Sequence, residues 1–305
     1  MPTVGSVHVS APLTNLAIKY KNLALVGERI LPVVPVIKEA DKYYIFGQEE
    51  LRDDSSLPRA AGAEAREIDW DVTSATYTAE EYALRHLVPD RIVANADVAV
   101  RPKISATYKL TQKILLGRER AVATLVQNTG SVGSSAVPTI KWDGTSPDIE
   151  KDIDTAKDAV RIAAGIEPTS IVLPYKTMLA VKRDSTVRNL IRYTVPGDTL
   201  LRNGDLPPVL WNLEVIIAGA IRNTATEGQS ASLGDVWADH VLVFYKEASP
   251  SLDSLSLGYI FRVGSFIAKT YRVEIRDGEM IQVGVIQDEK IVATACGYLI
   301  LDCMS

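Results

Sequence analysis

The chain has 305 residues, of which 47% are apolar and 23% are charged, a composition typical of globular rather than disordered proteins. The formal net charge of −5 disfavours a protein that wraps nucleic acid over its whole surface. No apolar stretch approaches the roughly 20 residues that a membrane-spanning helix needs. The N-terminus also lacks the basic region and apolar core of a signal peptide. The length predicts one large domain or two closely associated ones.

The sequence carries no local motif for phosphate, dinucleotide, metalloprotease or serine-hydrolase chemistry. Its histidines lie far apart, and Cys296 and Cys303 have no partner at metal-ligand spacing, so we expect free thiols and no metal site. Asp239 and His240 could form half of a general-base pair. They also directly precede the apolar run Val241–Tyr245, which favours a buried strand that begins with polar residues. We therefore predict no catalytic residue and no cofactor.

Residues 1–37 contain few charges and several prolines, among them Pro32 and Pro35. Each proline forces the residue before it into an extended state, so the apolar stretch 30–37 cannot be helical. This segment is predicted to be an extended arm that lies on an apolar surface.

Residues 38–85 predict a long two-stranded excursion with a polar, turn-rich tip. In the return arm, Ile68, Trp70 and Val72 alternate with acidic residues, and the outgoing arm 42–47 is rich in β-favouring aromatic residues. Each arm would be roughly 40–50 Å long at about 3.3 Å per residue. That length exceeds the ~19 Å radius of gyration expected for a domain of this size. Because an isolated hairpin is marginal in water, a neighbouring subunit is the natural surface for it.

Residues 101–127 give the strongest helix signal in the chain. Pro102 suits the first turn, apolar residues recur at steps of four and seven, and Asn128 and Gly130 form a stop signal. At 1.5 Å per residue the helix would be about 40 Å long. It is predicted to act as a spine that is too long to be buried completely.

The hairpin and the helix carry opposite charge. Residues 38–71 hold five basic and ten acidic side chains, a balance of −5, whereas residues 101–128 hold six basic and one acidic, a balance of +5. Both could be solvated faces, but complementary charge across a subunit boundary would set register and exclude wrong partners. Changing Lys109, Lys113 or Arg118 to Glu is expected to impair assembly more than folding. We predict that the inter-subunit contacts are made by Glu49, Glu50, Asp53, Asp54 and Trp70 on the hairpin, and by Lys109, Lys113, Arg118 and Arg120 on the helix.

The rest of the chain predicts an α/β subdomain followed by C-terminal strands. Residues 258–303 read as antiparallel strands around a tight Asp277-Gly278 turn. Within residues 148–257, apolar periodicity predicts helices over 148–164 and 175–193, strands over 170–174, 213–221 and 240–245, and a polar loop over 223–232.

Extended arm, acidic hairpin, spine helix, α/β subdomain and C-terminal strands, in this order, resemble the major capsid proteins of tailed bacteriophages, which have the Hong Kong 97-type (Johnson) fold. The stretches 69–71, 76–84, 234–243 and 290–300 resemble the family in detail. The resemblance covers nearly the whole chain and implies an α+β fold. It divides the chain into an N-terminal arm (1–37), an extended-loop hairpin (38–85), a peripheral domain with the spine helix (86–147), an α/β axial domain (148–257) and C-terminal strands of the peripheral domain (258–305).

The resemblance implies a coat protein that self-assembles into the hexamers and pentamers of an icosahedral head. The head would enclose double-stranded DNA without sequence-specific binding, and the protein would be a virion component assembled in the host cytoplasm, with no membrane partner. A portal protein and a separate scaffolding protein are expected partners, and a decoration protein is a further candidate. A fused scaffolding segment is expected to be absent, since the chain starts directly at the arm.

In some members of the family, subunits are covalently cross-linked by a Lys–Asn isopeptide bond between the extended loop and the peripheral domain. Here Lys38 or Lys42 could supply the amine, but residues 258–305 contain no asparagine. We therefore expect no such bond in this chain.

Two alternatives stay open. An encapsulin, a cargo-loaded compartment, has the same fold, but the proline-rich arm resembles phage capsids more than the helical N-terminus with which encapsulins hold cargo. A soluble α+β enzyme, with a site built from scattered residues, is the more distant alternative, and it leaves the long hairpin without a support.

Overall fold

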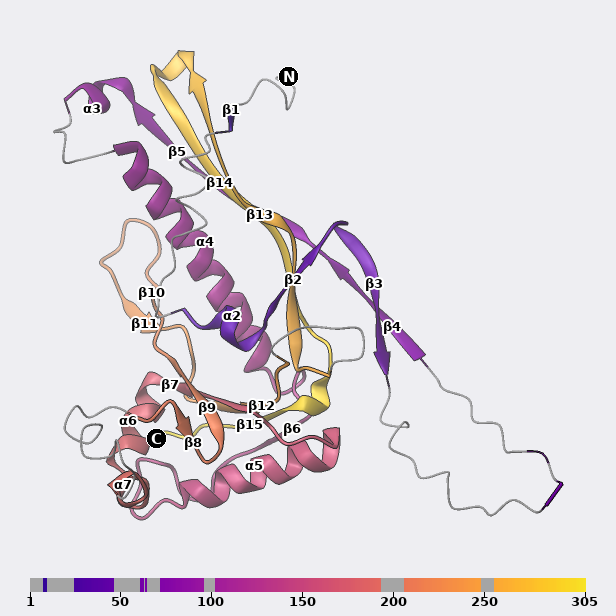
Figure 1. Cartoon of the computed structure of the whole chain (residues 1–305). Coiled ribbons are helices and arrows are strands. Elements are labelled where there is room, and N and C mark those ends of the chain that lie inside the picture. The colour runs from indigo at the N-terminus through magenta and orange to yellow at the C-terminus, as the bar shows by residue number, and fades with distance from the viewer. Residues whose placement is uncertain are drawn as a thin grey trace.

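The computed structural model describes residues 8–9, 25–46, 61–62, 64, 72–95, 102–192, 206–247 and 255–305. One sheet runs alongside a long helix, a second sheet lies at the C-terminal end of that helix, and a two-stranded hairpin projects to one side (Figure 1). The molecule is elongated because the helix connects the two sheets and the hairpin projects away from both of them.

The first sheet is built around a long antiparallel hairpin of β13 (Gly258–Val273) and β14 (Gly278–Ile291). A short 3₁₀ turn, η3 (Glu274–Arg276), and Asp277, with a φ of 40°, close this hairpin at the predicted turn. The sheet is completed by β5 (Glu80–Pro89), antiparallel to β14, by β1 (His8–Val9), antiparallel to β13, and by β2 (Val33–Val36), parallel to β13.

Strand β2 confirms the extended state that Pro32 and Pro35 predicted for this part of the arm. Just before it, the single turn α2 (Gly27–Ile30) ends at Leu31. Ile30 and Leu31 are fully buried, so the arm lies on an apolar surface of its own subunit at this point.

The spine helix is confirmed as α4 (Pro102–Val126), which runs along one face of the first sheet (Figure 1). Its apolar side chains recur at helical spacing. Near the start of the helix they pack with strand residues of β5, β13 and β14 in one core cluster: Ala106, Leu110, Ile114 and Leu115 meet Val88, Phe266, Ala268, Ile281, Val283 and Val285. The short helix α3 (Asp90–Ala94) follows β5.

The second sheet has the strand order β6-β15-β12-β7-β9-β8. Only two of its pairings are parallel, β7 with β9 and β15 with β6. All residues of β7, β12 and β15 are buried, as expected for central strands. The strands are β6 (Ser134–Ala136), β7 (Ser170–Pro174), β8 (Val209–Leu210), β9 (Leu213–Ala218), β12 (Val241–Phe244) and β15 (Gly297–Ile300).

Helix α5 (Ile149–Ala164) covers the second sheet and confirms the prediction for 148–164. Asp148 caps its start by accepting a hydrogen bond from the Lys151 N–H. Gly165, with a φ of 71°, ends it in the left-handed conformation that glycine tolerates. This helix and its sheet form the expected α/β body.

The helix predicted over 175–193 is wrong in one respect, because the structure divides it into α6 (Tyr175–Arg183) and α7 (Ser185–Arg192). The residue between them, Asp184, has an extended backbone with a ψ of 134°. Its Oδ1 accepts hydrogen bonds from the N–H groups of Thr186 (2.9 Å) and Val187 (3.0 Å), so the aspartate caps a new helix instead of continuing the first.

One further expectation needs correction. The segment 258–305 does not all join the first sheet, because β15 pairs with β12, whose fully apolar strand offers it a buried edge. The short 3₁₀ turn η4 (Thr294–Cys296) makes this change of sheet. The polar loop expected over 223–232 is confirmed for residues 224–232, which form the tip of a hairpin of β10 (Ile221–Asn223) and β11 (Leu233–Asp235).

Candidate inter-subunit surfaces and the residues that support them

The projecting hairpin consists of β3 (Ala40–Phe46) and β4 (Val72–Thr78), paired from Ala40 opposite Thr78 to Phe46 opposite Val72. An aromatic cluster fixes its base on β13. The ring of Phe261 stacks on Tyr77, with ring centres 4.5 Å apart, and on Tyr43, with ring centres 5.4 Å apart. The hairpin therefore leaves the body from an anchored base. Its predicted span of 38–85 is too long, because residues 80–85 belong to β5 and pair with β14 in the first sheet.

Beyond this base the strands extend away from the rest of the subunit (Figure 1). Tyr44 is 66% exposed, and Ile37, which precedes β3, is 96% exposed. A two-stranded ribbon without a third strand or a covering helix is marginally stable in water. In an isolated subunit, the described strands of the hairpin therefore lack a covering surface that would stabilise them.

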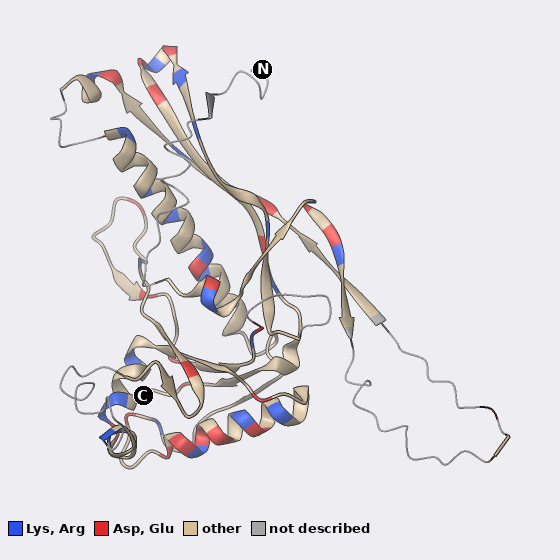
Figure 2. Cartoon of the chain, in the orientation of Figure 1, with Lys and Arg blue, Asp and Glu red and all other residues tan. Residues whose placement is uncertain are grey.

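Three of the four predicted helix cations lie exposed on α4: Lys109, Lys113 and Arg120. Steps of four and seven residues place them on one stripe of the helix, pointing away from the first core. Figure 2 shows blue segments recurring along α4. The hairpin residues predicted to meet them, Glu49, Glu50, Asp53, Asp54 and Trp70, lie outside the described residues.

Arg118, the fourth predicted cation, has a different environment and is corrected here. Its side chain is 6% exposed, and its Nη1 lies 2.9 Å from Oε1 of Glu28. Arg262 Nη2 lies 2.8 Å from the same oxygen. Burial lowers the pKa of the Arg118 guanidinium, and Glu28 opposes that shift. Arg118 therefore links α4 to the arm within one subunit and is not part of the exposed stripe.

Glu119, the next residue, was missed as a functional candidate. It is 1% exposed and accepts three hydrogen bonds: from the backbone N–H groups of Val26 (3.0 Å) and Gly27 (2.8 Å) and from the indole Nε1 of Trp237 (2.8 Å). A signal was present in the sequence, since an acid four residues after Leu115 and three before Val122 lies on the apolar face of the helix.

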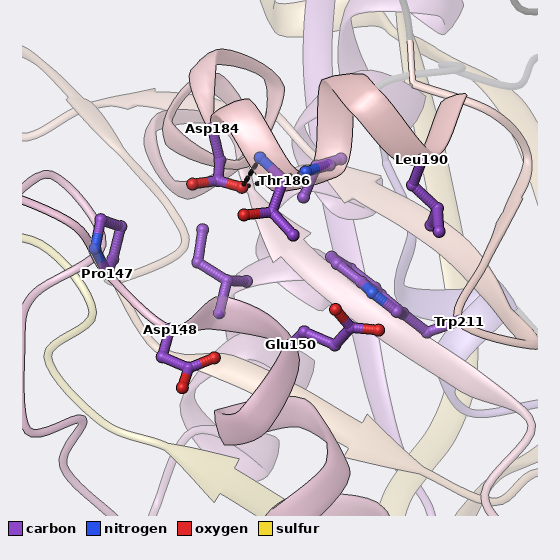
Figure 3. Close-up of a pocket in the computed structure, with 9 residues that line it drawn as sticks. Pro147, Asp148, Glu150, Asp184, Thr186, Leu190 and Trp211 are labelled. Atoms are coloured by element: carbon purple, nitrogen blue, oxygen red, sulfur yellow. Dashed lines mark hydrogen bonds between the residues drawn. The ribbon is translucent and has the colours of Figure 1, made fainter. Parts of the chain in front are cut away.

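A hollow between α5 and α7 gathers acidic side chains but does not resemble a catalytic site (Figure 3). Asp148 and Asp184, which line it, each accept backbone N–H groups at the start of a helix. Trp211, also at the rim, has a φ of 54° in the two-residue turn between β8 and β9. Two of the three acids that line this hollow, Asp148 and Asp184, are explained by helix capping.

The remaining residues considered in the sequence, His240, Cys296 and Cys303, lie in environments that serve the fold. His240 Nδ1 accepts a hydrogen bond from the Asp302 N–H (3.0 Å) at the mouth of the buried strand β12. Cys296 and Cys303 are free and buried, and burial raises the pKa of both thiols to about 12. Within the described ranges, no three His, Cys, Asp or Glu side chains are grouped to hold a metal ion. Every helix in those ranges is too short or too polar to cross a bilayer.

Scanned against models of known protein families, the chain matches none. It is 25% identical over 302 residues to the major capsid protein of Pseudomonas phage JBD67, and the alignment covers 95% of each chain. It is also 25% identical over 304 residues to the major capsid protein of Burkholderia phage BcepMu, covering 96% of this chain and 95% of that one. Along nearly its whole length the chain is therefore similar to two phage major capsid proteins.

Solved structures agree in fold with this capsid protein. A phage-related protein from Bordetella bronchiseptica matches with a TM-score of 0.72 and 24% identity, over 97% of this chain and 98% of that one. The capsid of a native gene transfer agent particle matches with a TM-score of 0.63 and 13% identity, over 98% and 94% of the two chains. The α+β architecture is therefore the Hong Kong 97-type capsid fold, as the sequence resemblance implied.

The capsid protein is a structural component of the virion and assembles from multiple copies of itself. Its two curated relatives are named for a structural role, the major capsid protein of a phage. The surfaces that matter for its function are therefore those that meet other copies of the chain.

Proposed function

We propose that the capsid protein forms the hexamers and pentamers of an icosahedral head that encloses the double-stranded DNA genome of a tailed phage. The observation that carries this proposal is the pairing of two features of one subunit. A hairpin anchored only at its base needs a covering surface. A long helix presents a stripe of exposed cations, Lys109, Lys113 and Arg120.

In the proposed assembly, the hairpin of one subunit overlies α4 of the next. The acidic segment 49–54 and Trp70 then meet the stripe of cations on the neighbour. Complementary charge of this kind sets the register between copies and disfavours wrong partners more than it adds affinity. A contact between two different surfaces also allows rings of five or six copies to close.

The domain assignment follows the two sheets. We assign the first sheet, α4 and the residues around them to the peripheral domain, and residues 148–247 with β6 and β15 to the axial domain around each capsomer axis. Residues 1–37 form the arm and 38–79 the extended loop. The expected boundaries at 147 and 258 shift to this extent, because β6 and β15 belong to the second sheet.

Further partners belong to the same proposal. We propose a portal protein and a separate scaffolding protein as partners during assembly, which we place in the host cytoplasm. A decoration protein on the outer surface is a further candidate. DNA would be enclosed without sequence-specific contacts, as a net charge of −5 favours repulsion over condensation.

Light scattering and negative-stain microscopy of the purified chain test this function. We expect megadalton shells, tubes or capsomer rings, because the hairpin and its receiving helix lie on the same chain. A stable particle near 33.2 kDa at all protein and salt concentrations, with or without a candidate scaffolding protein, would contradict the proposal. A co-purifying cargo enzyme would instead support the encapsulin-type compartment.

Mature particles are expected to dissociate completely into single chains on a denaturing gel. The segment 258–305 contains no asparagine, so the amine of Lys38 or Lys42 has no amide partner there for an isopeptide bond. Covalent ladders of two or more chains, resistant to boiling in detergent and reductant, would overturn this expectation. A shell boiled in detergent without reductant serves as the control that reveals disulfide-linked chains.

A further inference from the structure

Two hydrophobic cores meet on the spine helix. Leu110, Ile114 and Leu115 belong to the core of the first sheet. Val122 and Val126, farther along the same helix, belong to the core of the second sheet. The boundary between these cores is the buried pair Arg118–Glu119, which lies between Leu115 and Val122 in the sequence.

At this boundary Glu119 joins its own helix to two other parts of the chain, the arm and the segment before β12. Its Oε2 accepts the Gly27 N–H and its Oε1 the Val26 N–H, which satisfies two donors at the start of α2 that no side chain of the arm caps. Its Oε1 also accepts the indole N–H of Trp237, which lies between β11 and β12. The arm and the second sheet are thus tied to the helix by one carboxylate.

The approach of the arm to Glu119 depends on a glycine. A Cβ placed on Gly27 would lie 3.1 Å from Oε2 of Glu119 and 3.4 Å from Cγ2 of Val122. Side chains larger than hydrogen would push the arm away from the carboxylate. The backbone of α2 is therefore fitted to Glu119 at close range.

A second tie lies two turns farther along. Gln127, just after α4, accepts the Ala238 N–H (3.0 Å) through Oε1 and donates from Nε2 to the carbonyl oxygens of Ala238 (3.1 Å) and His240 (3.3 Å). Glu119 and Gln127 together hold the segment 237–240 against the helix. We call these two residues and Trp237 the joint.

The joint is the directional part of this boundary. Apolar contacts between the cores are strong but non-directional, so they permit a range of angles between the helix and the second sheet. Hydrogen bonds to a buried carboxylate are short and angle-dependent. The joint therefore constrains the angle between the two bodies, beside the ion pair of Arg29 with Glu214 that links the arm to β9.

We propose that Glu119 is a positioning residue for shell assembly, which fixes the second sheet and the arm relative to the spine helix and so sets the angle that each subunit presents to its neighbours. This inference rests on the proposed function. A repeated contact between two different surfaces closes only when its rotation is correct, and otherwise it continues as an open array. Loosening the joint therefore changes the shape of the assembly more than the fold of the subunit.

The test compares two tryptophan variants of the full chain. Trp237→Phe removes the donor to Glu119, whereas the control, Trp142→Phe, removes the matched donor to Asp152 Oδ2 (2.9 Å). Both indoles are 2% exposed, so the two changes delete the same chemistry at the same burial. Of the two tryptophans, only Trp237 donates to a residue of α4 and so connects that helix to the segment before β12. Gln127→Ala is a third variant that releases the same segment without changing the core.

We expect wild type and Trp142→Phe to give the same distribution of particle radii by electron microscopy. Trp237→Phe and Gln127→Ala are expected to lose most closed shells of that radius and to form open sheets or shells of mixed size. Similar urea midpoints for the two tryptophan variants would show that stability is not the cause. If Trp237→Phe does not fold, Gln127→Ala carries the test alone.

The inference is overturned if Gln127→Ala and any folded Trp237→Phe keep the wild-type radius distribution. It is equally overturned if Trp142→Phe broadens the distribution as much as they do. Absence of shells from the wild-type chain under every condition counts against the proposed function instead, so the two failures can be told apart.

Discussion

Reversing the three exposed cations of the spine helix, Lys109→Glu, Lys113→Glu and Arg120→Glu, is expected to abolish shell formation while the subunit stays folded. The stripe changes from three positive to three negative charges, and the acidic hairpin of the neighbour would then face like charge. Like-charge contacts across an interface cost several kcal/mol. Exposed substitutions of this kind usually change the free energy of unfolding by less than about 0.5 kcal/mol each, and no described residue forms an ion pair with these three side chains.

Sedimentation of assembly reactions measures the yield of shells, and urea unfolding measures the stability of the subunit. A charge-swapped chain is the control. Adding Glu49→Lys, Glu50→Lys, Asp53→Lys and Asp54→Lys to the triple variant restores opposite charge and should restore part of the yield. Wild-type shell yield from the triple variant would contradict charge pairing between the hairpin and the helix of the neighbouring subunit.

Arg118→Glu is expected to have the opposite profile, with a large loss of subunit stability. The change removes one of the two guanidinium partners of Glu28 and places a new carboxylate beside both Glu28 and the buried Glu119. Removing one partner of a buried ion pair costs about 3–5 kcal/mol. The free energy of unfolding, measured in urea under conditions that keep the chain unassembled, should fall by that amount.

The matched control is Arg120→Glu, two residues along the same helix and exposed to solvent. It should change the free energy of unfolding by no more than about 0.5 kcal/mol. Equal effects of the two variants, or an unchanged midpoint for Arg118→Glu, would contradict the separation between the internal cation and the exposed stripe.

The contrast between these two arginines shows how far the sequence could predict the site. The spine helix itself was predictable, because its apolar spacing and end signals are local. The exposure of each cation depends on which face of the helix is covered, and Arg118 follows Ile114 by four residues and Leu115 by three. That spacing already placed Arg118 on the buried face, so the correction could have been drawn from periodicity alone.

Other features depended on contacts between distant segments and could not be predicted. Glu119 and Trp237 are 118 positions apart, and no local pattern pairs a carboxylate with an indole across that distance. The change of sheet at β15 depends on the open edge of β12. The break at Asp184 was different, since an aspartate followed by Ser185 and Thr186 is a recognisable helix start.

The most direct test of the central claim, that the hairpin of one subunit rests on the spine helix of the next, is zero-length carboxylate–amine cross-linking of shells assembled from equal amounts of isotopically light and heavy chains. Mass spectrometry should find the segment 49–54 joined to Lys109 or Lys113 in peptides that combine a light with a heavy partner as often as two of one kind. Links found only between peptides of the same isotope would place the contact within a subunit and contradict the account.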